Sequence, residues 1–491
     1  MLGTYITFPE LLIWLPFITG IICFFLKDAA KTAALTGAIL TLAVSIATLF
    51  LTDPAYNNVN YLWLKHLGNS YYVGIDGTGR ILTLLNAVAF PLILAICGRN
   101  VKNPGSFFGL MMLSQAGMMG VFTAMDALLF YFFWELALIP VYFLSSRWGG
   151  ERRIQATFKF FIYTFAGSLL MLVGLLYVYQ HTPARIFEDG TRTAHSFAFQ
   201  SFQAATLGEG QQSWLFWLFF AAFAIKMPVF PFHTWQPDAY DQSPTPVTMV
   251  LSGIMVKMGL FGVIRWLIPV LPDAVDKYAD IAILLAVIGI LYASLIAMVQ
   301  DNLKRLIAYS SIAHIGLMAA ALFSLDELGV QGMLIQMFNH GINIIGLWVV
   351  VDIIERRTGT KKISELGGLA TKAPALTIML VVVALANIAL PLTNAFVGEF
   401  MMFGGLFRFN PWFAAAAIIS IILAAAYTLN MIRKVFYGEV SAASSQATDL
   451  AWNEKFVLAI IVILILVLGV YPQPLFNIVG EAAGMISGTT V

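Results

Sequence analysis

Charged residues are scarce in this sequence. Asp, Glu, Lys and Arg make up 11% of the 491 residues, whereas 60% of the residues are hydrophobic. Soluble globular domains carry roughly 25% charged residues. The formal net charge is +1 at pH 7, so no basic excess indicates a nucleic-acid partner. The composition therefore predicts a protein whose surroundings are mostly lipid bilayer.

Cysteine is also rare. The chain has only Cys23 and Cys97, and both fall in long apolar runs. Iron–sulfur clusters and Cys-rich zinc sites need several thiolates. The sequence therefore predicts no Cys-ligated redox centre, and we expect no cofactor in this chain.

Long apolar runs recur along the whole sequence, and each can cross a hydrocarbon core of about 30 Å. They predict an all-α, polytopic membrane protein of about 14 transmembrane helices, two of them broken. The polar stretches 53–80 and 181–212 are expected to be surface loops. The expected helices are 8–26, 32–52, 81–98, 107–124, 127–146, 156–180, 213–240 (interrupted), 245–270, 278–299, 303–323, 327–354, 373–406 (interrupted), 411–437 and 455–475.

The Lys and Arg residues favour one side of this arrangement. When the loops are assigned alternately to two sides, 17 of the 27 basic residues fall on one side and 6 on the other. The positive-inside rule places the richer side in the cytoplasm. An even number of helices then places both termini on the opposite, periplasmic side of a bacterial inner membrane.

Four basic residues remain within the expected helices. Lys159 and Arg265 lie nearer helix ends, where long side chains can reach the headgroups. Lys226 and Lys257 lie deeper, where a charged lysine costs about 2.5–3.5 kcal/mol on insertion scales. Four further ionisable residues lie deep in expected helices, namely Glu135, His314, His340 and Glu399.

Six such groups on six helices are typical of a proton relay. If Glu135 faces Lys226, neutralising the acid would destabilise the ammonium and favour release of its proton. Lys257, His314 and His340 would then carry the proton laterally, and Glu399 would release it. Each group also has a purely structural interpretation. Glu135 and Lys226 could form a static ion pair, the histidines could join helices by hydrogen bonds or ligate one haem, and Lys257 could satisfy the carbonyls of a broken helix.

Two helices are interrupted next to these groups. Pro228 and Pro231 follow Lys226, and Pro391 precedes Glu399. Proline removes a backbone donor, and in lipid the freed carbonyls are tolerated only where they face protein or a wet cavity. Paired interruptions are typical of transporter repeats. We therefore expect inverted five-helix units at 107–277 and 278–437, preceded by helices 1–3 at 1–106 and followed by a loop and the last helix at 438–491.

Several long motifs resemble one family. "FFWELALIPVYFL", "FAIKMPVFPFHTWQPDAY", "SPTPVTMVLSGIMVKMGLFGVIRW", "DNLKRLIAYSSIAHIGLM" and "NHGINIIGLW" are similar to the antiporter-like membrane subunits of respiratory complex I. Among these, the subunit M family of bacterial NADH:quinone oxidoreductase is the most similar. The resemblance implies a cofactor-free proton-translocating subunit of that enzyme, driven by quinone reduction elsewhere, with subunits L and N as its neighbours.

The resemblance also implies roles for individual residues. Glu135 and Lys226 match the family's fifth-helix glutamate and seventh-helix lysine, and Lys257 matches its central lysine. His314 and His340 match the histidines that link its two half-channels, and a glutamate at the position of Glu399 is similar to subunit M. The twelfth-helix break differs, since Leu-Pro-Leu at 390–392 replaces Leu-Pro-Gly.

Three alternatives remain open at this point. The chain is also similar to subunits of multisubunit Na⁺/H⁺ (Mrp-type) antiporters, which have no redox link. A membrane-bound hydrogenase subunit would use the same relay with another electron donor. A structural scaffold, in which the charges only fix helix packing, is the third.

Overall fold

The computed structural model describes residues 6–98, 101–186, 190 and 192–488. Among these residues, twelve helices are long and apolar enough to cross a membrane. They are α1 (Phe8–Phe25), α2 (Ala30–Ala47), α4 (Gly77–Ile96), α5 (Pro104–Thr123), α6 (Ala127–Trp148), α7 (Arg153–Tyr179), the continuous helix Thr245–Leu267, α13 (Pro272–Met298), α14 (Leu303–Phe323), α15 (Glu327–Thr358), α19 (Pro411–Phe436) and α20 (Trp452–Val470).

Two further segments are interrupted helices, as the sequence predicts. The first consists of α9 (Glu209–Lys226) and α10 (Gln236–Gln242), and the second of α17 (Pro374–Asn387) and α18 (Asn394–Phe409). Together with the twelve uninterrupted helices they are compatible with the expected number of 14. The division into two inverted five-helix units stays a prediction.

The helix Thr245–Leu267 changes its winding along its length. It is formed by α11 (Thr245–Val250), the wide π-helical turn η2 (Leu251–Met255), α12 (Lys257–Gly262) and a second π-helical turn η3 (Val263–Leu267). Such turns occur frequently at functional sites. Lys257 is the first residue after η2, so the expected deep lysine lies at one of these irregularities.

The two long polar stretches are more ordered than simple surface loops. The first contains α3 (Pro54–Asn57), the antiparallel strands β1 (Asn58–Leu64) and β2 (Asn69–Gly74) and the turn η1 (Lys65–Leu67); the second contains β3 (Arg185–Ile186), β4 (Arg192–Thr193) and α8 (Phe199–Gln203). Ser196 donates a hydrogen bond to the Gly68 carbonyl at 3.2 Å and is fully buried. The two stretches therefore pack on each other and close one end of the bundle.

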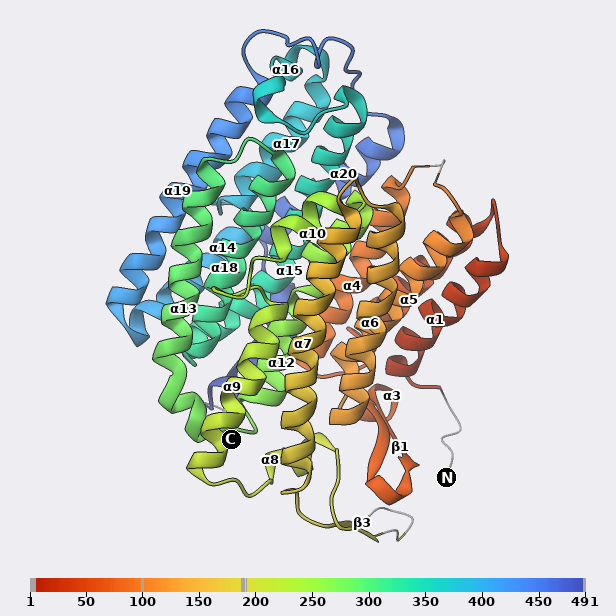
Figure 1. Ribbon diagram of the computed structural model, residues 1–491, viewed down its shortest axis with the longest axis vertical. Coiled ribbons are helices and arrows are strands. Elements are labelled where there is room, and N and C mark those ends of the chain that lie inside the picture. The colour runs from red at the N-terminus through yellow and green to blue at the C-terminus, as the bar shows by residue number, and fades with distance from the viewer. Residues whose placement is uncertain (1–5, 99–100, 187–189, 191, 489–491) are drawn as a thin grey trace.

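The opposite end carries the basic loops, with η4 (Ile363–Glu365) and α16 (Leu369–Lys372) at its tip (Figure 1). We call it the basic end, since it holds the richer set of Lys and Arg. A final helix, α21 (Gln473–Ser487), lies at the end that carries the hairpins, and Pro472 precedes it. The sequence analysis missed α21 because it is short and strongly amphipathic.

Different helices form the core and the lipid-facing surface. Thr245–Leu267 is fully buried, and α14 and α15 are nearly so. By contrast, α1, α2, α19 and α20 expose large apolar side chains such as Phe25, Trp412 and Val470. Because a bilayer surrounds such a surface with hydrocarbon, outward apolar residues are expected there. The central buried helices are the ones that carry the deep histidines and Lys257.

Candidate functional site

The break after Lys226 is closed by hydrogen bonds. The Met227 N–H donates to the Phe223 carbonyl at 2.8 Å and ends α9. The Trp235 Nε1–H donates to the Ile225 carbonyl at 2.9 Å, so a side chain satisfies an acceptor that the helix has left free. Buried carbonyls need such partners, and this arrangement lets the helix stop at Lys226 inside the protein.

Lys226 itself is almost completely buried and makes no ion pair with any residue that the structure describes. Its Nζ lies 5.3 Å from the centroid of the Trp134 ring, and no described residue accepts a hydrogen bond from it. Glu135 is close enough to act on Lys226 electrostatically, yet its Oε1 also lacks a hydrogen-bond partner among the described residues. The static Glu135–Lys226 ion pair considered from the sequence is therefore not formed here. An ammonium over an indole face is a cation–π contact, worth about 2 kcal/mol when desolvated.

Lys257 and His340 are in direct contact at the centre. Lys257 Nζ lies 2.9 Å from His340 Nδ1 and donates to the Ser252 carbonyl at 3.0 Å. Both side chains are buried. The sequence-based suggestion that Lys257 satisfies carbonyls of an irregular helix is thus correct for one carbonyl, and the histidine contact is present in addition.

His314 and Glu399 bring a basic and an acidic side chain into contact. His314 Nδ1 lies 3.0 Å from Glu399 Oε1, and their side chains are only 10% and 8% exposed. Gln336 Nε2 donates to the same oxygen at 3.3 Å. Gln336 is four residues before His340, so both lie on one face of α15. That spacing is a signal that could have identified Gln336 from the sequence.

The two histidines link these contacts. Their ring centroids are 5.6 Å apart at an interplanar angle of 50°. Each Nε2 lacks a hydrogen-bond partner within the part of the chain that is described. Lys257, His340, His314 and Glu399 therefore form one continuous row, whereas Glu135 and Lys226 form a separate group.

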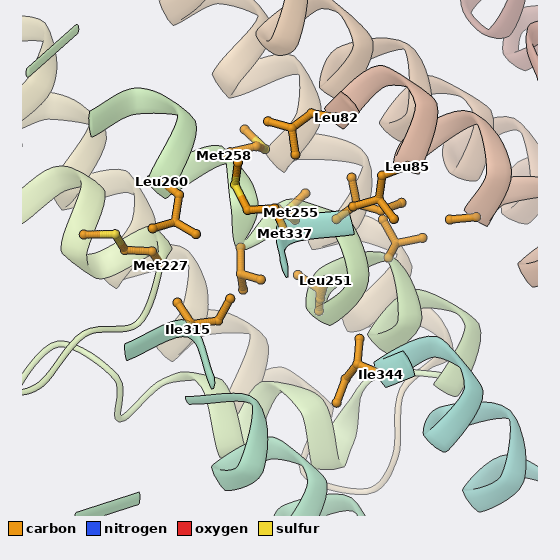
Figure 2. Close-up of a cluster of buried hydrophobic side chains, with 14 of the residues drawn as sticks. Leu82, Leu85, Met227, Leu251, Met255, Met258, Leu260, Ile315, Met337 and Ile344 are labelled. Carbon is orange, nitrogen blue, oxygen red and sulfur yellow. The ribbon is translucent and has the colours of Figure 1, made fainter. Parts of the chain in front are cut away.

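A cluster of buried apolar side chains lies on the helices that carry Lys257, His314 and His340 and on their neighbours (Figure 2). Met227, Met258 and Ile315 directly follow Lys226, Lys257 and His314 in the chain. Met255 and Met337 precede Lys257 and His340 by two and three residues. Leu82, Leu85, Leu251, Leu260 and Ile344 complete the labelled cluster. Within the described residues, no group of three or more His, Cys, Asp or Glu is placed to hold a metal ion.

The second break has an unusual backbone. Leu392 has φ +73° and Ala389 has φ +54°, values that favour glycine. Leu392 therefore adopts the left-handed conformation that a glycine would take here, so it does not straighten the break. Asn339 Nδ2 donates to the Asn394 carbonyl at 2.8 Å and anchors the start of α18 to α15.

Lys159 and Arg265 are the two basic residues that we expected near helix ends, and only one of them lies as expected. Lys159 pairs with Asp238 at 2.8 Å and is about one-third exposed, consistent with a position near a helix end. Arg265 does not reach outward. Its guanidinium is buried, lies 2.5 Å from Asp76 Oδ2 and sits over Phe199 and Phe261. The sequence analysis missed Asp76 as a partner because the two residues are far apart in the chain.

Comparison with known proteins identifies the family. Residues 124–424 match the family described as "NADH:quinone oxidoreductase/Mrp antiporter, TM". NADH-quinone oxidoreductase subunit M of Rhodobacter capsulatus is 37% identical over 92% of this chain and 89% of its own length. Subunit M of Escherichia coli (strain K12) is 34% identical over 97% of this chain and 96% of its own. The chain therefore belongs to the NADH-quinone oxidoreductase subunit M family.

Solved structures share the fold. A chain of respiratory complex I from Thermus thermophilus with bound NADH superposes with a TM-score of 0.87 at 30% identity, covering 97% of this chain and 98% of that chain. A chain of the Mrp complex from Dietzia sp. DQ12-45-1b gives a TM-score of 0.86 at 19% identity, covering 98% of both chains. The second likeness shows the fold alone. Both structures are multisubunit membrane assemblies.

Proposed function

We propose that this chain is a proton-translocating, antiporter-like membrane subunit of an NADH:quinone oxidoreductase. The observation that carries the proposal is the row of buried contacts Lys257–His340–His314–Glu399 in a subunit M relative. Packing alone does not require four ionisable groups at successive short distances in a bilayer, where each is costly. Every one of the four can bind and release a proton.

The six residues then have distinct roles. Glu135 and Lys226 form the group at the first break, in which neutralising Glu135 would destabilise the Lys226 ammonium and favour release of its proton. Lys257, His340 and His314 carry the proton between the two breaks. Glu399 is the terminal group of the row. Quinone reduction in other subunits supplies the driving force, and this chain itself holds no cofactor.

The surroundings follow from the same proposal. The chain spans a bacterial inner membrane with its basic end in the cytoplasm and both termini on the periplasmic side. Subunits L and N are its neighbours. A subunit of a Mrp-type Na⁺/H⁺ antiporter or of a membrane-bound hydrogenase is the second candidate, since a Mrp chain has the same fold.

The first experiment isolates the chain with its partners. The tagged chain is expressed in its own host and purified in mild detergent, and the eluate is assayed for NADH oxidation by an artificial electron acceptor. Co-eluting peripheral Fe–S subunits with NADH activity are the expected result. Small membrane subunits without redox activity would instead establish the antiporter alternative.

A matched pair of variants then tests the relay. Lys226→Met is expected to abolish proton pumping in vesicles while the complex still assembles. Lys277→Met is the control, because Lys277 also lies over an aromatic ring, 5.4 Å from the Tyr278 centroid, but on the exposed surface. Equal pumping by both variants would contradict the role of Lys226.

A further inference from the structure

Two cavities lie one above the other between α13, α14 and α19. The inner cavity, of about 10 Å³, is lined by His314 and Glu399 together with Ser294 and Ser420. Such a volume holds about one water molecule. The outer cavity, of about 170 Å³, is lined by Gln300, Asp301, Asn430 and Lys434 among others. Its polar lining belongs to the loops and helix ends of the basic end.

One residue lines both cavities. Tyr427 of α19 is 2% exposed and is part of the wall of each. Seven residues, about 10 Å of helix rise, separate Tyr427 from Lys434 at the outer mouth. On α14, Leu306 faces the outer cavity and His314 the inner one, so the order of the two cavities is the same along both helices.

The Tyr427 hydroxyl is held where the cavities meet. It donates to Ser310 Oγ at 2.9 Å, and Ser310 Oγ also accepts from Asn387 Nδ2 at 3.1 Å. Ser310 lies on α14 between Leu306 and His314. Asn387 is the last residue of α17, so these hydrogen bonds join the tyrosine to the broken helix whose second half carries Glu399.

We propose that the space between α13, α14 and α19 is a proton access path from the basic end to Glu399, and that Tyr427 is its gate. The role of this path in pumping rests on the proposed function, whereas the path itself is inferred from the residues that line the two cavities. In this structure the gate is closed, since the tyrosine ring separates a polar cavity from a one-water cavity. Movement at the second break would withdraw Asn387 from Ser310, which leaves the Ser310 hydroxyl free to rotate away from Tyr427 and so releases the tyrosine. A proton would then move on water through the two cavities and bind a carboxylate oxygen of Glu399. No other bond would form or break.

Sided reaction of a buried thiol tests the gate. Cys23 and Cys97 are replaced by serine, and Ser294→Cys is introduced, because Ser294 is fully buried except toward the inner cavity that it lines. Ag⁺, which is small and does not cross a bilayer freely, is applied from one side of oriented vesicles. Thiols that remain are counted with a fluorescent maleimide after denaturation.

Tyr427→Ala is expected to raise the rate of Ag⁺ reaction from the basic end at least tenfold, because it joins the two cavities. Tyr427→Phe is expected to raise it about 2- to 12-fold, the factor equivalent to the 0.5–1.5 kcal/mol of one hydrogen bond. Tyr240→Phe is the matched control, since Tyr240 is also buried but lies on α10 and its hydroxyl has no partner among the described residues. It should leave the rate unchanged.

Two outcomes would overturn the gate. One is an equal rate with Tyr427, Phe and Ala at position 427. The other is faster reaction from the end that carries the hairpins. Proton pumping is measured on the same vesicles. Either of these two outcomes with pumping intact would refute only the gate. Equal pumping by the Lys226→Met and Lys277→Met variants would instead refute the proposed function.

Discussion

Gly259 holds the end of α9 in place. A Cβ added at Gly259 would lie 2.7 Å from Met227 Cβ, from Met227 N and from the Phe223 carbonyl oxygen. The last two atoms form the hydrogen bond that ends α9. Lys226 lies between these residues in the chain, so Gly259→Ala is expected to displace the backbone that carries the lysine.

The size of the effect follows from the distances. Ordinary van der Waals contact starts at 3.4 Å, so α12 and α9 must separate by about 0.7 Å. Overpacking of this kind costs about 1–3 kcal/mol. Alanine is favoured over glycine in a helix by about 1 kcal/mol, which partly offsets that cost.

Gly210→Ala separates the two contributions. Gly210 also lies in α9, and a Cβ there meets nothing within 4 Å, so this variant changes helix propensity without steric strain. We expect Gly259→Ala to unfold with a free energy about 1–3 kcal/mol lower than Gly210→Ala in a sodium dodecyl sulfate titration.

Two further measurements complete the test. Hydrogen exchange at the Met227 amide should be faster in Gly259→Ala, and proton pumping should fall. Equal unfolding free energies, with unchanged exchange and pumping, would refute the reasoning, because the helices would then relax without moving Lys226.

Three further predictions concern stability. Leu392→Gly should leave the free energy of unfolding unchanged or raise it by up to about 1 kcal/mol, since φ +73° favours glycine, whereas Leu392→Val should lower it; equal values for both in a detergent titration would contradict this. Arg265→Gln should cost about 1–3 kcal/mol by removing the ion pair between the buried guanidinium and Asp76, while Arg408→Gln, which breaks an exposed pair at 3.7 Å, should cost under about 1 kcal/mol; thermal melting compares them. Asp449→Asn should cost about 0.3–1 kcal/mol at neutral pH, because the Asp449 carboxylate lies at the N-terminus of α17 and, though partly desolvated, accepts backbone hydrogen bonds from Ala375, Leu450 and Leu376 that hold its pKa below the usual value. A lowered folded pKa means that this stabilisation is complete above about pH 4 and is lost as the pH falls, so the difference from the wild type should shrink in acid; a constant difference would contradict it.

Much of the fold was predictable because membrane helices are set by local composition. The apolar runs and the two proline interruptions gave the uninterrupted and broken helices. What the runs could not show is the order in the polar stretches, where β1–β2 and the segment around Ser196 pack on each other. That packing depends on residues more than 100 positions apart, such as Ser196 and Gly68.

The site was predictable as a set of residues but not as a geometry. A charge inside an apolar run is conspicuous, so Lys226, Lys257 and Glu399 could be selected one by one. Their contacts could not be foreseen: Lys226 lies over Trp134 rather than against Glu135. A tryptophan in an apolar helix resembles ordinary core, and only the folded arrangement shows which ring faces the ammonium.

The ionisable groups at the two ends of the relay differ in their contacts. At the first break Lys226 has no hydrogen-bond partner among the described residues, whereas at the second His314 and Glu399 are bound to each other. If α18 moves so that Glu399 leaves His314, the movement would reach Ser310 and Tyr427 through the hydrogen bond of Asn387 to Ser310. Opening of the access path and breaking of the His314–Glu399 contact would then be one event, so that Glu399 is exposed to the basic end only when it has no partner in the row. Such coupling would prevent a proton that arrives through the access path from passing directly onto His314.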